Sequence, residues 1–300
     1  MTSTAYLLIS HGSRDPRHQI AMNRLAQLVR ERLQPLSDSW STAPLAPTMG
    51  VKPYSPSLTQ LPSGRNNRRR EQAGGVMIVE PMAAQKSSAP LQPSSQNHTC
   101  IVGSAALEFG LLPLHQQIIE FGRRLTSAGV KRLQLVPLFL LQGRHVMDDI
   151  PEEVDLARRE LGGCIDIHVG DHIGGYGAMR DLIASRLAST PRKGRLLVAH
   201  GSRRPKGNRS VDQLAKSLGT AVAYWSNMSE IEDQTIQLMQ QGCSTLTIFP
   251  YFLFAGGITD AVAHLTEELA ERFPRTKFRL LPPLGATVDM ADLVVDNLRS

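Results

Sequence analysis

Apolar positions along the chain follow two patterns that alternate with each other. Short runs rich in Leu, Ile and Val, such as residues 6–10 and 196–199, are separated by longer stretches in which apolar residues recur every three or four positions. The first pattern predicts strands that are buried on both faces, and the second predicts amphipathic helices. This alternation is typical of a parallel sheet covered by helices on both sides.

The predicted elements fall into two similar series. In the first half of the chain, strands are expected at 6–10, 100–105, 132–140 and 166–169, and helices at 17–33, 114–128, 151–161 and 176–187. In the second half, strands are expected at 196–199, 221–225, 245–254 and 277–281. The fold class is therefore expected to be α/β, with two tandem doubly wound domains built on parallel sheets.

The two series are copies of one sequence. Residues 6–14 (YLLISHGSR) recur as residues 195–203 (RLLVAHGSR), which aligns His11 with His200 at an offset of 189. Further along, Pro137 aligns with Pro250 at an offset of 113. An internal duplication of this kind decides the whole architecture. We expect an N-terminal domain at 1–190 that carries the active site and a C-terminal domain at 191–300.

The change of offset reveals an insertion in the first copy. Between its opening histidine and the middle of the repeat, the first copy holds 76 more residues than the second. Residues 35–98 are rich in Pro, Ser, Asn and Arg and keep no helical or strand period. This composition is typical of a disordered surface insertion. A docking arm for a partner is the alternative interpretation.

The net charge is +6, of which the insertion carries +3. The remaining charge is too small, and too free of interleaved aromatic residues, to indicate a nucleic-acid partner, but it is compatible with a small anionic ligand.

The chain has no apolar run of about 18 residues and no cleavable leader, so we expect a cytoplasmic protein without membrane contact. Cys100, Cys164 and Cys243 are too far apart in sequence for a zinc knuckle or a disulfide framework, and we expect small buried side chains.

Polar side chains follow several predicted strands at the point where each strand ends. His11 follows the first strand, Glu108 the second and His145 the third, while His200 follows the first strand of the second copy. Ligands of open parallel sheets bind beyond the carboxyl ends of the strands. One histidine there is more often structural than functional, but two imidazoles and a carboxylate at one edge can hold a divalent ion with positions left open.

The two copies differ at this edge. Aligning Pro137 with Pro250 places Ile258 opposite His145, and no glutamate follows the strand at 221–225. We therefore expect a single working centre on the first copy, with the second copy closing over it and His200 lining the far wall. The chain contains no Gly-x-x-x-x-Gly-Lys-Ser/Thr, Gly-x-Gly-x-x-Gly or Gly-x-Ser-x-Gly motif, so nucleotide use and serine hydrolysis are not expected.

Three of these motifs carry a family resemblance. They are His-Gly-Ser-Arg at 11–14, Ala-Leu-Glu at 106–108 and Val-Pro-Leu-Phe-Leu-Leu-Gln-Gly-Arg-His-Val-Met-Asp-Asp-Ile-Pro at 136–151. Together they resemble the sirohydrochlorin chelatases of the cobaltochelatase and ferrochelatase type, the class II chelatases. The similarity covers nearly everything outside the insertion.

The resemblance implies a lyase-class chelatase that inserts Co²⁺ or Fe²⁺ into sirohydrochlorin without ATP, on the route to cobalamin or sirohaem. The family's metal-contacting histidines map to His11 and His145, and its acidic residue maps to Glu108. A divalent metal would then be a substrate, with no permanently bound cofactor. An imidazole pair accepts Co²⁺, Fe²⁺ and Ni²⁺ alike, so the pattern does not choose among them.

The implied substrate is a flat macrocycle with acetate and propionate groups. Guanidinium pairs bidentately with carboxylate, so Arg14, Arg144 and Arg203 are candidate substrate-binding residues together with His200; ordinary surface arginines are the alternative. The candidate apolar walls, which are equally suited to the core, are Leu140, Leu141, Phe252 and Phe254.

Two rival functions use the same residues. A non-catalytic carrier of metal or tetrapyrrole would need the histidines but no base, and would tolerate the loss of Glu108. A metal-dependent hydrolase would normally need more carboxylate ligands than this edge offers. The sequence favours no particular oligomeric state.

Overall fold

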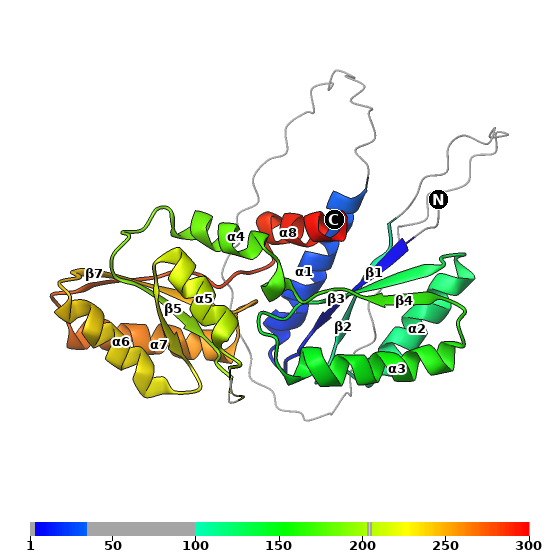
Figure 1. Ribbon diagram of the computed structural model, residues 1–300, viewed down its shortest axis with the longest axis horizontal. Coiled ribbons are helices and arrows are strands. Elements are labelled where there is room, and N and C mark those ends of the chain that lie inside the picture. The colour runs from blue at the N-terminus through cyan, green and yellow to red at the C-terminus, as the bar shows by residue number, and fades with distance from the viewer. Residues whose placement is uncertain (1–3, 35–99, 203, 205, 300) are drawn as a thin grey trace, which may run out of the picture. The chain divides into compact units, whose positions relative to one another are not determined.

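The computed structural model describes residues 4–34, 100–202, 204 and 206–299. These residues form two four-stranded sheets (Figure 1), and every neighbouring pair of strands in them is parallel. The predicted α/β class with two tandem parallel sheets is confirmed. The predicted insertion at 35–98 and Arg203 lie outside the described residues, and the domain division at 190 stays a prediction.

The elements alternate along the chain as the periodicity predicts. The first half contains β1 (Thr4–Ser10), α1 (Pro16–Leu33), β2 (Val102–Ala106), α2 (Leu114–Ser127), β3 (Arg132–Pro137), the π-helical turn η1 (His145–Asp149), α3 (Ile150–Leu161), β4 (Asp166–Val169), the 3₁₀ turn η2 (Ile173–Gly175) and α4 (Ala178–Leu187). The second half contains β5 (Arg195–Ala199), α5 (Arg209–Leu218), β6 (Ala221–Tyr224), α6 (Met228–Gln240), β7 (Thr245–Tyr251), α7 (Gly257–Arg272), β8 (Lys277–Leu280) and α8 (Val288–Arg299).

The strand order creates a switch point in each sheet. The first sheet runs β2-β1-β3-β4 and the second runs β6-β5-β7-β8. In the first sheet the register pairs Ser10 with Ala106 and Ile9 with Pro137, so β1, β2 and β3 end at the same edge. The chain leaves β1 toward one side for β2 and returns to the other side for β3, which opens the crevice where doubly wound folds bind ligands.

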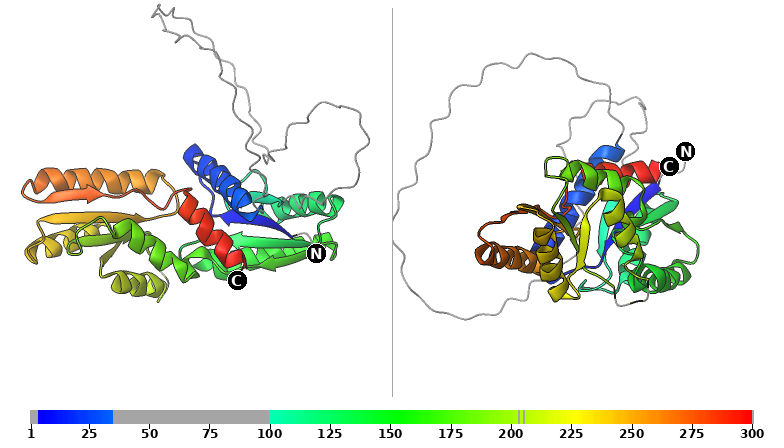
Figure 2. Two further views of the ribbon diagram at one scale, coloured as in Figure 1. Left: turned by 90° about the horizontal axis from the view of Figure 1, so that it is seen from above. Right: turned by 60° about the vertical axis from the view of Figure 1, so that its left-hand side comes forward.

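The last helix of each half packs on the other half. α8 lies beside α1 in the views of Figures 1 and 2, and α4 packs against α5 and α8. One continuous core therefore contains Leu8 and Met22 of the first half together with Phe249 and Met290 of the second. The opposite face of the first sheet is covered by α2 and α3, which form a separate apolar cluster with residues such as Leu7 and Ile118.

Arginine side chains bind the helices α4 and α8, each of which packs on the other half of the chain. Arg186 of α4 donates to the main-chain oxygens of Pro283 and Leu284, at 3.0 and 2.6 Å, just before α8. Arg32 of α1 pairs with Asp292 of α8 at 3.1 Å. A charged donor to a buried carbonyl is worth more than a neutral hydrogen bond. These contacts tie the end of α4 to the segment that leads into α8, and the end of α1 to α8 itself.

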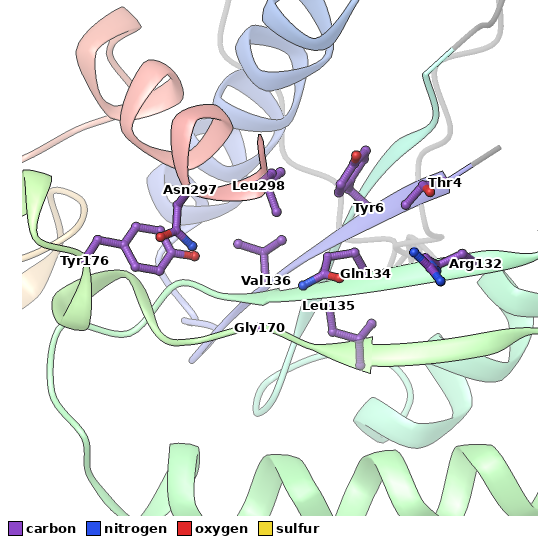
Figure 3. A pocket seen from close by; sticks show the side chains of 10 residues that line it. All are labelled: Thr4, Tyr6, Arg132, Gln134, Leu135, Val136, Gly170, Tyr176, Asn297 and Leu298. Carbon is purple, nitrogen blue, oxygen red and sulfur yellow. The ribbon is translucent and has the colours of Figure 1, made fainter. Parts of the chain in front are cut away.

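A small pocket of about 180 Å³ lies between the first sheet and α8 (Figure 3). Tyr6 and Gln134 line it from the strands, and Asn297 lines it from α8. Burial raises the pKa of the Tyr176 phenol to about 12, and a hydrogen bond with Asn297 acts in the opposite direction. The segment that leads into α4 is thus tied directly to α8.

The structure corrects several predicted boundaries. The strands expected at 132–140 and 245–254 end at Pro137 and Tyr251, because the residues beyond them form loops. The helix expected from Pro151 begins earlier, since η1 runs without a break into α3. In the π turn the Ile150 N–H donates to the His145 carbonyl. This widened turn accommodates Pro151, which has no N–H and would crowd an ordinary turn.

The expected burial of the cysteines is wrong, because Cys164 is exposed and Cys100 and Cys243 are only partly buried. Cys164 lies in the turn between α3 and β4, and the other two lie just before β2 and β7, so none reaches a sheet interior. Among the described helices, none combines the length and hydropathy needed to cross a bilayer.

The partly buried imidazole of His172, just after β4, makes stability depend on pH. Burial lowers its pKa below the ordinary value, and the nearby Asp171 carboxylate opposes this shift only in part. Below about pH 6.5 the unfolded chain takes up a proton at His172 that the folded state binds more weakly, so stability should fall as the pH falls. We expect His172→Gln to flatten the decline of Tm between pH 7 and 5. The exposed His168→Gln is the matched control, and equal slopes in the two variants would contradict the expectation.

Candidate functional site

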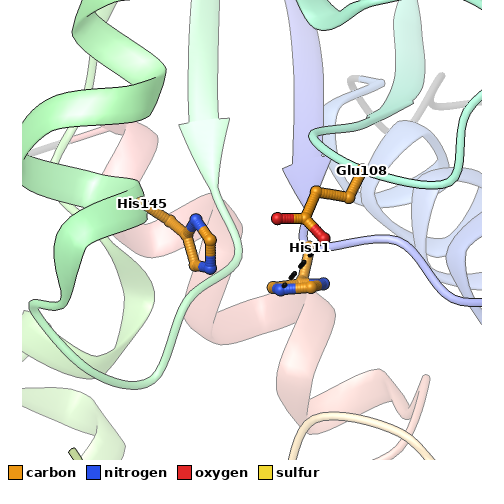
Figure 4. A group of neighbouring side chains, drawn as sticks. All are labelled: His11, Glu108 and His145. Atoms are coloured by element: carbon orange, nitrogen blue, oxygen red, sulfur yellow. Dashed lines mark ion pairs between the residues drawn. The ribbon is translucent and has the colours of Figure 1, made fainter. Parts of the chain in front are cut away.

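Three side chains predicted from the sequence converge at the carboxyl edge of the first sheet (Figure 4). His11 directly follows β1, Glu108 lies in the loop after β2, and His145 lies in the helical turn that precedes α3. One ligand atom from each lies within 4.8 Å of the other two. The His11 Nε2 atom is 3.9 Å from Glu108 Oε2, and the two imidazole rings are 4.7 Å apart at 84°.

Backbone contact brings Glu108 to His11. The Glu108 N–H donates to the His11 carbonyl at 2.8 Å. Gly12, which directly follows His11, has a φ of +89°. A Cβ at position 12 would lie 1.9 Å from the Glu108 carbonyl oxygen. Glycine is therefore required here both for the left-handed backbone and for the close approach of the two loops.

The imidazole of His145 is oriented by Asp149, a neighbour that the sequence pattern did not indicate. Its Nδ1 atom lies 2.7 Å from Asp149 Oδ2, four residues further along the helical turn. A carboxylate at Nδ1 fixes the tautomer and leaves Nε2 free as a ligand. Once residues 145–149 are known to be helical, the spacing of four identifies this pair.

The three ligand atoms are spaced for a loosely held ion. Two bonds of about 2.1 Å at a tetrahedral angle would place donor atoms about 3.4 Å apart. The separation of 3.9 Å between His11 Nε2 and Glu108 Oε2 is somewhat larger, so modest rotations of the side chains would bring them onto one ion. The side chains of His11, Glu108 and His145 are 46%, 47% and 32% exposed, which would leave a bound ion open to exchange.

A cleft of about 840 Å³ opens beside the histidines and is lined by residues of both halves. His11 and His145 line it from the first half, and His200 lines it from the second. The four apolar residues suggested as walls all contribute to its lining, namely Leu140, Leu141, Phe252 and Phe254. A large, mainly apolar cleft with a few polar groups suits a flat organic ligand.

The candidate arginines differ in their surroundings. Arg144 lines the cleft and pairs with Asp149 at 3.2 Å. Arg14 is exposed and lies over the ring of Phe109, with 5.3 Å between the guanidinium carbon and the ring centre. Arg204, which the sequence analysis did not select, joins Asp148 of the π turn at 2.7 Å.

The cleft is also lined by His18, a histidine that sequence reasoning missed. His18 lies in the first turns of α1, and its ring packs edge-on to Phe254 of the other half at 5.3 Å. Burial lowers its pKa, the positive form of His11 lowers it further, and the Asp15 carboxylate opposes both effects. The signal was available, because the start of a helix that follows a strand faces the same sheet edge as the strand's end.

The second copy keeps the backbone of the site without its ligands. The Ser226 N–H donates to the His200 carbonyl at 2.9 Å, just as Glu108 does to His11. Ser226 therefore occupies the place of Glu108. A comparable cluster of histidine and acidic ligands occurs in the described residues only at His11, Glu108 and His145.

Comparison with known families agrees with the duplication. A family model described as CbiX matches residues 96–190 and again residues 194–300, together more than half of the chain. The chain belongs to the CbiX family. The match of one CbiX model to each half supports the interpretation of the halves as copies.

Individual relatives of this CbiX protein are distant. It is 28% identical over 116 residues to the chloroplastic sirohydrochlorin ferrochelatase of Arabidopsis thaliana, a match that covers 35% of this chain and 51% of that protein. The chain thus spans about half the length of this curated relative. The resemblance to sirohydrochlorin chelatases is confirmed.

Two solved structures share the fold over nearly the whole chain. The sirohydrochlorin chelatase SirB of Bacillus subtilis subspecies spizizenii in complex with cobalt is 17% identical, with a TM-score of 0.63 and coverage of 99% of this chain and 94% of SirB. SirB from Bacillus subtilis with Fe³⁺ is 16% identical, with a TM-score of 0.64 and the same coverage. At these identities the similarity establishes the fold of this CbiX protein.

Removing the carboxylate that orients His145 should weaken metal binding. We expect Asp149→Asn to reduce affinity for Co²⁺ by about 10- to 100-fold, because the imidazole would lose its fixed tautomer and direction. Calorimetric titration of the purified protein measures this directly. Asp155→Asn, on the exposed face of α3, is the control; equal affinities in both variants would show that Asp149 does not orient the ligand.

A side chain at position 12 should damage the fold more than one at a comparable turn. We expect Gly12→Ala to lower the free energy of unfolding by about 2–5 kcal/mol, from backbone strain and overlap with Glu108 together. Gly129 also has positive φ, but a Cβ there meets nothing within 4 Å, so Gly129→Ala should lose only about 1–2 kcal/mol. Urea unfolding of both variants tests the difference, and equal losses would contradict it.

Proposed function

We propose that this protein is a lyase-class chelatase that inserts Co²⁺ or Fe²⁺ into sirohydrochlorin without ATP, for cobalamin or sirohaem synthesis. The observation that carries the proposal is the convergence of His11, His145 and Glu108 at the edge of a cleft of about 840 Å³. Metal ligands and a base thus lie beside a space that suits a macrocycle.

Metallation of a tetrapyrrole requires two operations at one place. The incoming ion must shed water as it meets the macrocycle nitrogens, and two pyrrole N–H protons must leave. Neutral imidazoles hold a divalent ion without tying it to the protein by charge, which suits transfer of the ion. In the proposal His11 and His145 hold the metal substrate, and Glu108 accepts protons.

The geometry leaves Glu108 available for this role. Its nearest imidazole nitrogen, Nε2 of His11, is 3.9 Å away, which is beyond hydrogen-bonding distance. About half of the carboxylate side chain is exposed. Its oxygens can therefore accept a proton from a ligand at the edge of the cleft and pass it on to water.

The cleft supplies contacts for both parts of the substrate. Leu140 and Phe252 belong to the loops that leave β3 and β7, and they offer apolar surface for the macrocycle. Arg144 lies at the same cleft, and Arg14 lies beside Glu108 through its contact with Phe109. In the proposal these arginines pair with the acetate and propionate groups, and His200 contacts the macrocycle from the second half.

The relatives support the same chemistry. The Arabidopsis thaliana relative is a sirohydrochlorin ferrochelatase, and the SirB structures contain cobalt or Fe³⁺. These properties belong to those proteins, and the proposal extends them to this chain because the candidate ligands are present in it at the edge of the shared fold.

Anaerobic incubation with sirohydrochlorin and Co²⁺, Fe²⁺ or Ni²⁺ tests the activity. The change of the macrocycle spectrum on metallation should proceed faster with protein than in buffer, without added nucleotide. A rate equal to that in buffer for every metal would refute the proposal.

Loss of the base distinguishes a chelatase from a carrier. We expect Glu108→Gln to lower kcat by about 10²- to 10⁴-fold, because a positioned base contributes a factor of this size. Metal binding should persist, since both imidazoles remain. Glu120→Gln on the exposed face of α2 serves as the control. A Glu108→Gln variant that retains full function would favour the non-catalytic carrier.

A further inference from the structure

Phe109 adopts a backbone conformation that aromatic residues normally avoid. Its φ is +58°, and it directly follows Glu108 in the loop after β2. Its side chain is also 54% exposed, so the strained position is not compensated by burial in the core. A bulky residue in the left-handed region costs about 1–2 kcal/mol, and such outliers concentrate at functional sites.

The repeat itself does not require this strain. Because Ser226 takes the place of Glu108, the residue equivalent to Phe109 in the second copy is Asn227. Asn227 has a φ of −133°, an ordinary negative value that any residue adopts. The left-handed backbone at Phe109 is therefore particular to the copy that carries His11, Glu108 and His145.

The strained residue has one prominent partner. The guanidinium carbon of Arg14 lies 5.3 Å from the centre of the Phe109 ring, and the ring centre is 6.2 Å from that of His11. Among the described residues, Arg14 has no carboxylate partner, whereas Arg144 pairs with Asp149 and Arg204 pairs with Asp148. Arg14 is thus a cation beside His11 whose N–H donors have no acceptor within the part of the chain that the structure describes.

We propose that Phe109 is a positioning residue that holds Arg14, through a cation–π contact, to receive a peripheral carboxylate of the tetrapyrrole. This inference rests on the proposed function and names the contact that fixes the macrocycle beside His11. A carboxylate in place of Phe109 would hold Arg14 equally well but would occupy its fork of donors. An aromatic face holds the cation and leaves all five N–H groups free.

Binding without metal isolates this contact from the chemistry of insertion. We expect Phe109→Asn to raise the dissociation constant for sirohydrochlorin by roughly 3- to 10-fold, and Arg14→Gln to raise it by at least as much. Phe109→Tyr should bind like the wild type, because it keeps an aromatic face. Leu111→Asn, an apolar residue of the same loop that is 69% exposed, is the matched control and should not change binding.

Two further readouts separate positioning from direct stacking and from a structural role. The double variant of Arg14→Gln with Phe109→Asn should bind no more weakly than Arg14→Gln alone, because the ring acts through the arginine. Neither substitution should change the dissociation constant of a porphyrin in which alkyl groups replace most carboxylates. Phe109→Asn should also raise Tm by about 1–3 °C, since asparagine adopts left-handed backbone at lower cost.

The outcomes distinguish this inference from the proposed function. Metal insertion by the wild type, together with unchanged sirohydrochlorin binding in Phe109→Asn, would overturn the inference alone. Weaker binding in Phe109→Asn with no effect of Arg14→Gln would also overturn it, in favour of direct stacking. A fall in Tm of several degrees would assign Phe109 a structural role instead. Binding that follows the expected pattern without metal insertion would refute the chelatase and keep the contact.

Discussion

The exchange of terminal helices is the constraint on which the rest of the structure depends. Each sheet has one face covered by helices of its own half, but the other face shares a core that includes α4 and α8 from both halves. Buried apolar surface is the main favourable term in folding. Without α8, residues such as Leu8, Met22 and Val136 would lose part of their cover. The strand that leads to His11, a candidate metal ligand, is therefore packed in a core that includes the last helix of the described chain.

This shared core also explains why the cleft has walls from two copies. β3 and β7 both end where loops leave the sheets, and those loops supply Leu140 and Phe252 to one cavity. The ion pair between Asp148 and Arg204 joins the π turn of the first half to the opening loop of the second. Asp149 of the same turn contacts His145, so one short segment carries both the ion pair to the second half and the carboxylate beside His145.

Much of this arrangement could be predicted from the sequence, because strand and helix periods are strong signals and carboxyl ends of parallel strands meet at one edge. His11, Glu108 and His145 were identified on that basis. The π turn was not, since Pro151 indicates a helix start and no pattern reports a widened turn before it. The orienting role of Asp149 depends on that turn, and the strain at Phe109 depends on a loop conformation that residue types alone do not encode. The exchange of α4 and α8 likewise follows from tertiary packing.

Under the proposed function, the difference between the copies follows from the geometry of a planar ligand. A flat macrocycle presents one face to the groups that deliver an ion, and its opposite face needs contact without competing ligands. A second set of imidazoles and carboxylate at the other wall would offer the ion an alternative resting place. In that proposal, Ser226 in place of Glu108 and Ile258 in the cleft lining would remove the alternative, while the backbone around Gly201 is kept. The duplicated fold thus supplies two walls of one cleft, and in the proposal only the first wall carries the chemistry.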